Sequence, residues 1–399
     1  MQKEKKWFLA VVVIVVVAAV SSIVTYAVTK HKMNTGEIYL KNDSYAELMQ
    51  YYELKNVREI LAEHYAEEIS DARQETLVQG AVGGMMRALG DGYSAFYTAE
   101  EYDAYFDEQL DGSFIAQGML LEWNESTGYP VVRQVFADTA AYEAGISAGD
   151  TILSVEGKST YGKEIGITLG YIRGVEGTSV TLRLKRGAQE KEQTLVRTEA
   201  AVQVVYTGTA TDKAGYIRIV EFTGNCAEEL AAALRSMQDE KAEALVLDLR
   251  GVRGGYIREA AEAANLLLDK GQIATSVRQG QEGMRWESDA EVESTLPVVV
   301  LTDGATSGVA EVFAAALQDR GRAQVAGQTT RGQAASTAIF KVPSTGSMVK
   351  LVTAYYVSPN GRQIQGQGVA PDVALELGDG SAEAEAALLA EAAALVLSE

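Results

Sequence analysis

Hydrophobic positions along the chain follow three patterns, and each predicts a different kind of structure. Trp7 to Val28 is a run of 22 residues without a charge, which exceeds the roughly 20 apolar residues that cross a lipid hydrocarbon layer. Residues 44–106 place apolar side chains at helical spacing. Residues 199–375 alternate short apolar runs with amphipathic stretches, which predicts an α/β domain. The helical pattern consists of Leu48, Tyr52, Val57, Ile60, Leu61 and Tyr65.

The apolar run at the N-terminus predicts a membrane anchor. Lys3, Lys5 and Lys6 precede it, so the short N-terminal tail should stay in the cytoplasm and the rest of the chain should be exported. A cleaved signal peptide is the alternative, but its apolar region is usually only about 7–15 residues long. We therefore predict a single-pass protein of the cell membrane, with most of the chain on the extracytoplasmic side, periplasmic or extracellular.

Composition excludes several classes of function. The chain has 399 residues, of which 47% are hydrophobic and 23% charged, as expected for folded domains. Its net charge of -20 argues against a nucleic-acid partner, because phosphate binding needs clustered Lys and Arg. Cys226 is the single cysteine, so no internal disulfide is expected. Neither a metal-ligand spacing nor a phosphate loop is present, and we predict no cofactor.

A stretch before the α/β region has the pattern of a PDZ domain. Ala140–Leu153 matches the Ala-x-x-Ala-Gly-x-x-x-Gly-Asp-x-Ile turn and strand of such domains, and we assign residues 112–198 to one. PDZ domains add an extended C-terminus to a sheet edge and hold its carboxylate with backbone N–H groups. The alternative is a PDZ fold retained only as a spacer. The predicted peptide-binding residues are Gln117, Gly118, Met119, Leu120 and Leu121.

The stretch Thr302–Thr337 reads as a strand, a turn of small residues, a helix, a short strand and a Gly-rich turn. It resembles the active-site segment of the C-terminal processing (tail-specific) serine peptidases. In that family the nucleophilic serine lies three places before a glutamate, a lysine base follows later, and a glutamine lies four places beyond the lysine. Taking Glu311 as the glutamate, the resemblance places Gly308 at the nucleophile, Gln333 at the base and Thr337 at the supporting glutamine.

Two further segments resemble the same family. Arg250–Gly255 corresponds to its Arg-Gly-Asn-Pro-Gly-Gly loop, whose backbone N–H groups line the oxyanion site. Here Asn-Pro is replaced by Val-Arg, and Arg253 either binds a peptide carboxylate or is a solvated surface arginine. Leu89–Ser94 is similar to the family's Leu-Gly-Asp-Pro-Tyr-Ser, which we interpret as part of a helical packing module. The resemblance covers about residues 44–375. The predicted oxyanion-loop residues are Gly251, Gly254 and Gly255.

These replacements remove the chemistry of a serine peptidase. Gly308 has no nucleophile, and the amide of Gln333 has no basic lone pair to accept a proton. Ser307 is the one rescue candidate, but one residue on a helix is about 100° of rotation, so its hydroxyl should point elsewhere. We expect Ser307 to be the N-cap of the following helix. The two histidines, His31 and His64, lie too far along the chain to supply a base.

We therefore interpret the chain as a pseudo-peptidase that binds unfolded or C-terminal peptide segments, or regulates an active paralogue. Self-association as a homo-oligomer stays open. An active serine endopeptidase using Ser307 and a purely structural scaffold are the competing interpretations. The expected fold is an α/β peptidase core with an inserted PDZ domain, an N-terminal helical module and one transmembrane helix. The predicted divisions are a tail at 1–6, the anchor at 7–28, a tether at 29–43, the helical module at 44–111, the PDZ domain at 112–198, the core at 199–375 and an Ala/Glu-rich helix at 376–399.

Overall fold

The structure, a computed structural model, describes residues 21–22, 42–103, 115–198, 202–289, 292–378 and 380–397. The chain divides into two units, the first ending at Val78 and the second beginning at Gln79. The predicted anchor lies outside the described residues except at Ser21 and Ser22, and the tether lies outside them except at Asn42 and Asp43, which begin a helix. In the described part, no helix is both long and apolar enough to cross a bilayer.

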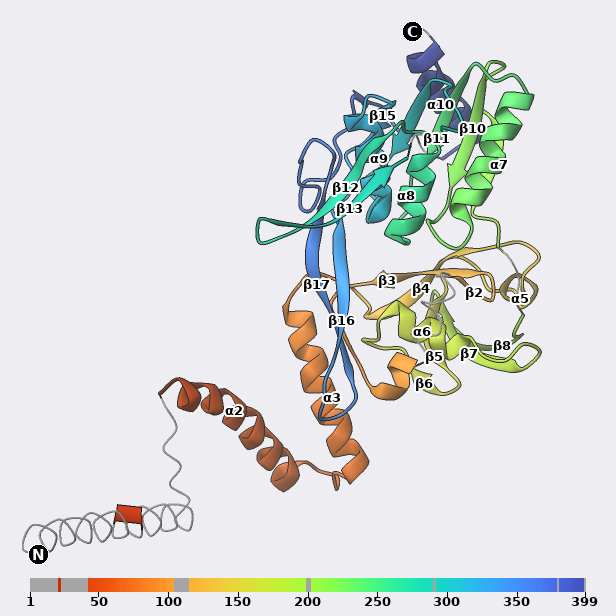
Figure 1. Ribbon diagram of the computed structural model, residues 1–399. Coiled ribbons are helices and arrows are strands. Elements are labelled where there is room, and N and C mark those ends of the chain that lie inside the picture. The colour runs from red at the N-terminus through yellow and green to blue at the C-terminus, as the bar shows by residue number, and fades with distance from the viewer. Residues whose placement is uncertain are drawn as a thin grey trace, which may run out of the picture. The chain divides into compact units, whose positions relative to one another are not determined.

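Six strands form the central sheet of the second unit, in the order β18-β15-β14-β11-β10-β9 (Figure 1). All neighbours pair in parallel except β9 and β10, which are antiparallel. Every residue of β11 and β14 is buried, which explains their uninterrupted apolar sequences. The strands are β9 (Val205–Thr209), β10 (Ala214–Ile219), β11 (Ala244–Asp248), β14 (Val298–Thr302), β15 (Ala323–Gly327) and β18 (Val373–Ala374).

Helices cover both faces of this sheet. Alternate strand residues such as Leu247 and Val300 join the apolar cluster beneath three helices, whereas Val246 and Leu301 face the C-terminal helix. The C-terminal helix is therefore docked, with Leu388 buried against the sheet. The helices on the first face are α7 (Cys226–Asp239), α8 (Ile257–Asn265) and α9 (Val309–Asp319), and the helix on the second face is α10 (Ala382–Leu397).

A second, five-stranded sheet has the order β1-β17-β12-β13, and β16 pairs with β17. Its first strand corrects the prediction that residues 44–111 are all helical. Ala95 and Tyr97 are buried on one side of β1, which pairs antiparallel with β17, so a strand replaces the expected helix there. The strands are β1 (Ala95–Tyr97), β12 (Gly271–Arg278), β13 (Gln281–Ser288), β16 (Ala335–Lys341) and β17 (Met348–Val357).

The predicted PDZ region forms a sheet of its own, in the order β2-β3-β4-β5-β7-β8, with β6 paired to β5. Its core contains Met119, Leu121, Ile152 and Leu182 and is separate from the core of the peptidase-like region. The elements are β2 (Ile115–Ala116), β3 (Met119–Asn124), β4 (Tyr129–Val135), α5 (Ala140–Glu143), β5 (Thr151–Val155), β6 (Lys158–Ser159), α6 (Ile165–Ile172), β7 (Ser179–Arg186) and β8 (Gln189–Val196).

A carboxylate ties the Gly-Asp turn of this region to its last hairpin. Arg186 donates to both oxygens of Asp150 at 2.5 and 2.6 Å, and Ser147 N donates to the same side chain. Burial alone raises the pKa of Asp150, but these hydrogen bonds outweigh it and hold the pKa below its usual 3.8. The ionised carboxylate therefore stabilises the folded state.

This carboxylate predicts an acid-dependent difference in stability. The contribution of Asp150 is complete above its unfolded-state pKa and is lost as pH falls through the lowered folded-state pKa. We expect Asp150→Asn to lower the thermal unfolding midpoint at pH 7, and the gap from the parent to narrow as pH falls below about 4. Scanning calorimetry from pH 7 to pH 3 measures this. An equal gap at all pH values would contradict it.

The first unit holds α2 (Asn42–His64) and the start of α3 (Asp71–Ala88). The apolar positions on α2 were predicted to be core, and this is wrong for the described side chains. Tyr52, Val57 and Ile60 are 43%, 49% and 58% exposed. Helical spacing correctly predicted a helix here, but α2 does not bury these side chains in the structure.

Candidate functional site

Gly308 occupies a turn that favours glycine. It lies between β14 and α9 and is the N-cap of α9, with φ of 70° and ψ of -134°. This backbone conformation strains any residue with a Cβ. A Cβ at this position would lie 3.3 Å from Gly254 Cα and 3.6 Å from Arg253 O. A side chain at position 308 would therefore point at the loop predicted to line the oxyanion site.

The structure brings position 333 to the same place. Gly308 N donates to Gln333 O at 3.0 Å, across 25 positions of sequence. Gln333 is half-buried, and Thr337 is exposed on β16. The Cβ site of Gly308 thus lies beside Gly254, and the N–H of Gly308 bonds to Gln333. Thr337 lies further along the strand. Their roles as nucleophile, oxyanion and base positions stay predictions from the resemblance.

Glu311 holds the two turns together from the first turn of α9. One of its carboxylate oxygens accepts hydrogen bonds from Gly308 N at 3.1 Å and Gln333 N at 2.7 Å. The other accepts from Thr330 Oγ1 and from Gly332 N. The side chain is fully buried, and burial raises the pKa of Glu311, although these four donors oppose the rise. The site keeps its geometry through this one carboxylate.

Ser307 does not have the role predicted for it. The N-cap of α9 is Gly308, one residue later, because the chain turns at the positive φ of the glycine. Ser307 is 2% exposed, and its backbone N donates to Val252 O at 2.8 Å. No lysine or histidine hydrogen-bonds to its hydroxyl in the part of the chain that the structure describes.

Tyr93 belongs to the site, which the sequence analysis missed. Its hydroxyl donates to Gln333 O at 2.9 Å. Burial and the nearby Glu311 raise the pKa of Tyr93 to about 12, so it is a neutral donor at pH 7. Asp91 fixes its turn by accepting from Tyr93 N and Ser94 N. The similarity of Leu89–Ser94 to a family motif was the available signal, but we interpreted it as helical packing.

The predicted oxyanion loop follows β11 and contains glycines with different roles. Gly255, at φ 119°, has no room for a Cβ, which would lie 2.3 Å from Phe222 O. Gly251 N donates to Asp303 Oδ1, so this N–H is already occupied. Gly254 N lies 3.7 Å from the Cβ site of Gly308, and within the described ranges it has no backbone partner. Of the three predicted glycines, Gly254 is the one whose N–H can face a ligand at position 308.

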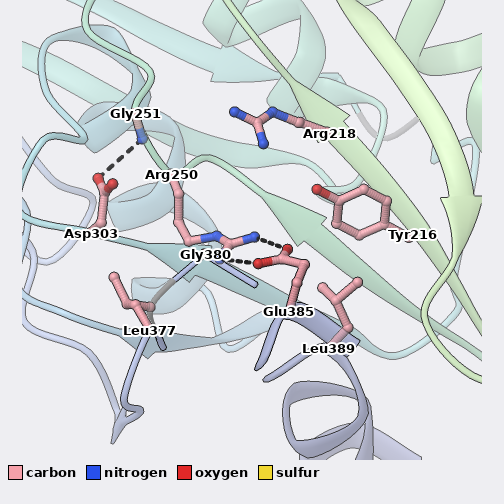
Figure 2. Close-up of a pocket in the computed structure, with 9 residues that line it drawn as sticks. All are labelled: Tyr216, Arg218, Arg250, Gly251, Asp303, Leu377, Gly380, Glu385 and Leu389. Carbon is pink, nitrogen blue, oxygen red and sulfur yellow. Dashed lines mark hydrogen bonds and ion pairs between the residues drawn. The ribbon is translucent and has the colours of Figure 1, made fainter. Parts of the chain in front are cut away.

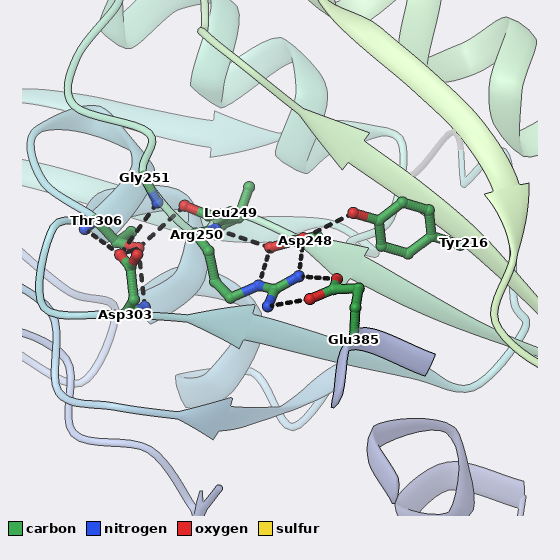
Figure 3. A network of polar contacts seen from close by, with 8 residues as sticks. All are labelled: Tyr216, Asp248, Leu249, Arg250, Gly251, Asp303, Thr306 and Glu385. Atoms are coloured by element: carbon green, nitrogen blue, oxygen red, sulfur yellow. Dashed lines mark hydrogen bonds and ion pairs between the residues drawn. The ribbon is translucent and has the colours of Figure 1, made fainter. Parts of the chain in front are cut away.

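A polar network fixes this loop from behind (Figure 3). Arg250 donates to both oxygens of Asp248 and both of Glu385, which joins the end of β11 to α10. Asp303 accepts from Gly251 N and from Thr306 N, which joins the β11 loop to the β14 loop. The network therefore joins both loops to each other and to α10.

Residues of this network also line a cavity of about 630 Å³ (Figure 2). Figure 2 shows Arg218 and Tyr216 of β10 on one wall and Leu377 and Leu389 on another. The guanidinium of Arg218 has no hydrogen-bond partner among the described residues. Among those residues, too, no group of three His, Cys, Asp or Glu side chains is placed to hold a metal ion.

Arg253 is an exposed arginine, as the second alternative predicts, and its guanidinium is ion-paired within the chain. Its guanidinium lies 2.8 Å from a carboxylate oxygen of Glu122 on β3. A second pair joins Arg133 of β4 to Glu221 at 2.8 Å, and both side chains are largely buried. Burial raises the pKa of Glu221, and the charge of Arg133 opposes the rise. The charge of Arg253 is therefore paired with a carboxylate of the same chain.

The predicted peptide-binding loop is enclosed. Gln117 accepts from Thr198 N through its side chain at 2.8 Å and from Ala141 N through its backbone carbonyl. Met119 and Leu121 are core residues, and Leu120 packs with the core of the α/β region. A peptide carboxylate at Gln117 and Gly118 would require this loop to open. Its role in binding stays a prediction.

Comparisons with known proteins decide the family. Residues 213–375 match Peptidase family S41, and residues 131–186 match a PDZ domain. The carboxy-terminal processing protease CtpA of Bacillus subtilis (strain 168) is 31% identical over 383 residues, which cover 95% of this chain and 79% of CtpA. This chain belongs to the C-terminal processing serine peptidase family. The resemblance found in the sequence is confirmed.

Two further proteins support the assignment to this family. The carboxy-terminal processing protease CtpB of the same organism is 30% identical over 334 residues, covering 82% of this chain and 68% of CtpB. The solved structure of a photosystem II D1 C-terminal processing protease has a TM-score of 0.58 and 24% identity, covering 85% of this chain and 91% of that one. This likeness shows the shared peptidase fold with its PDZ domain.

Proposed function

We propose that this chain is a pseudo-peptidase, a family member that binds unfolded or C-terminal peptide segments without cleaving them. One observation carries the proposal. Gly308 has no side chain where the turn aims a Cβ at Gly254, and Gln333, whose backbone carbonyl accepts the N–H of Gly308, has a non-basic amide as its side chain. Amide hydrolysis by this family's chemistry needs a nucleophile and a base at these two points. The scaffold that would hold them is retained through Glu311.

The proposal includes the cellular setting. The anchor at residues 7–28 and the tether at 29–43 would hold residues 44–399 outside the cytoplasm. The PDZ domain, at 112–198, would bind C-termini through the loop Gln117–Leu121 once that loop opens. An active paralogue is a further proposed partner, because a peptide-binding relative can deliver or withhold substrate.

The chain itself is expected not to cleave protein. We expect detergent-solubilised full-length protein to leave a chemically unfolded substrate intact, as followed by mass spectrometry, and to remain unlabelled by a fluorophosphonate probe. The reason is that losing a nucleophile or base costs about 10⁶ in kcat in a serine peptidase. The competing function is an active endopeptidase that uses Ser307. Cleavage or labelling that disappears in Ser307→Ala would establish that function and refute ours.

Peptide binding has its own test. Fluorescence anisotropy with a labelled C-terminal peptide should show saturable binding, and amidation of the terminus should weaken the part that depends on the PDZ domain. Absence of binding by every extended peptide tested would leave only a structural scaffold.

A further inference from the structure

One strand beside the site has an open edge. β16 (Ala335–Lys341) pairs with β17, and on its other side no described strand pairs with it. It begins two residues after Gln333, whose carbonyl accepts the N–H of Gly308. The open edge therefore begins beside the turn at Gly308.

The hydrogen-bond register shows which backbone groups point outward. At the hairpin turn, Val342 N donates to Ser347 O, so Val342 and Ser347 form a hydrogen-bonded pair. Bonded and non-bonded pairs alternate in an antiparallel ladder, so the next pair, Lys341 with Met348, is not hydrogen-bonded. At the other end Tyr356 N donates to Ala334 O, so the pair starting at Ala335 is again not bonded. The two ends agree on an alternation along β16, because the extra residue of the register shift between Ser336 and Thr337 is Thr353 on β17. The residues whose N–H and C=O point away from β17 are Ala335, Thr337, Ile339 and Lys341.

These outward groups are unoccupied within the described ranges. None of the four residues has a further backbone or side-chain hydrogen-bond partner there. Open edges in stable proteins are usually protected by prolines, inward bends or charges along the strand. From Ala335 to Phe340 the strand carries no charge and no proline. An unprotected edge of this kind can pair with an added strand.

Charges at the two ends select among possible occupants. Arg331 precedes the strand and Lys341 ends it, and both are exposed. The side chains between them at Ala335, Ser336 and Ala338 are small and leave room for a neighbouring chain. An extended segment with acidic residues near its ends therefore fits this edge better than a basic one.

We propose that the outer edge of β16 is a second peptide-binding site, which takes an extended polypeptide segment with acidic flanks as an added antiparallel strand. Main-chain hydrogen bonds to Ala335, Thr337 and Ile339 provide the binding, so no free C-terminus is needed. The bound segment runs past Thr337 toward Gly308. This inference rests on the proposed peptide-binding function and gives that function a location separate from the PDZ loop.

The test uses a probe that the PDZ loop cannot hold. It is an acetylated, C-terminally amidated, fluorescently labelled heptapeptide of alternating valine and threonine with an aspartate at each end. The full-length protein should bind it in anisotropy titrations. Thr337→Pro removes one outward N–H, a change that edge strands tolerate, and should weaken binding at least 10-fold. Thr337→Val keeps the N–H and should bind like the parent.

N-methylated probes test the parent protein without any mutation. Methylation of alternate amides removes the donors that face β16 in one set of positions and the solvent-facing donors in the other. The probe methylated at the amides that face β16 should lose binding, and the probe methylated at the solvent-facing amides should retain it. Equal binding of both sets, together with unchanged binding by Thr337→Pro, would overturn the inference.

The remaining outcomes separate the two proposals. If the amidated probe fails but the same peptide with a free carboxylate binds, the edge site is refuted and peptide binding by the PDZ domain survives. If neither peptide binds, the proposed function itself fails. If Thr337→Pro turns a dimer into a monomer in light scattering, the edge pairs with a second copy, which also refutes a peptide occupant.

Discussion

The double variant Gly308→Ser, Gln333→Lys is expected to cleave unfolded protein, whereas the parent chain does not. A serine at position 308 would point at Gly254 N, the predicted oxyanion donor, because the Cβ site lies 3.7 Å from that nitrogen. A lysine at position 333 would start from a half-buried backbone whose carbonyl bonds to Gly308 N. Partial burial lowers the pKa of a lysine and allows it to accept the serine proton.

The expected increase in cleavage rate follows from the cost of losing a nucleophile or a base. Because removing a nucleophile or base costs about 10⁶ in kcat, an imperfectly restored pair should still exceed the parent background by at least about 100-fold. A side chain at φ 70° strains the turn by about 1–3 kcal/mol, so the variant should unfold at a lower temperature than the parent. Adding Thr337→Gln should raise the rate further if that position supports the lysine.

Initial rates of cleavage of a quenched fluorescent unfolded substrate measure this gain. Both single variants are the matched controls, and each should remain at background because either group alone has no partner. Labelling by a fluorophosphonate should appear in the double variant and be absent from Gln333→Lys. A folded but inert double variant would show that more than these two side chains separates the chain from its active relatives.

Local sequence was enough to predict the parts of the site that lie close together along the chain. The all-apolar run of β14 and the helical run of α9 flank a turn of small residues, so strand, turn and helix follow from periodicity. The resemblance then placed positions 308 and 333, which the structure brings within one hydrogen bond. Such short-range patterns carry their own structural signal.

Contacts between distant segments were missed for a physical reason. Tyr93 and Gln333 are 240 residues apart, and nothing in the composition of either segment encodes their hydrogen bond. β16 was also missed, because Ala335–Ala338 are small residues without alternation of apolar and polar side chains. The turn at Gly308 misled the prediction for Ser307, since the positive φ of a glycine moved the helix start by one residue.

The preserved scaffold is informative because buried carboxylates are costly unless their hydrogen bonds are satisfied. Glu311 accepts from both turns, and Tyr93 donates to the same backbone that meets Gly308. A site kept for packing alone would do better with apolar residues of similar volume. This polar arrangement around Gly308 and Gln333 is what we expect of the proposed peptide-binding protein.

Glu311→Ala is expected to destabilise the second unit severely. It would leave three donors, Thr330 Oγ1, Gly332 N and Gln333 N, without their acceptor in a buried place, and Gly308 N would keep only Gln333 O. Removing one partner of a buried charged network costs about 3–5 kcal/mol, which is a large part of a domain's stability. The loss should appear as a lower urea midpoint with an unchanged slope.

Graded variants separate the hydrogen bonds of Glu311 from its volume. Glu311→Gln keeps the shape but presents an amide NH₂ to N–H donors, so it should still be clearly destabilised, although less than Glu311→Ala. Thr330→Val removes one of the four donors and also the acceptor of Val369 N, so it should cost about 1–3 kcal/mol, less than Glu311→Ala. Glu125→Ala, at an exposed turn residue, should change the midpoint by no more than about 0.5 kcal/mol. If Glu311→Ala were as stable as Glu125→Ala, the two turns would not depend on this carboxylate, and their juxtaposition at Gly308 would need another cause.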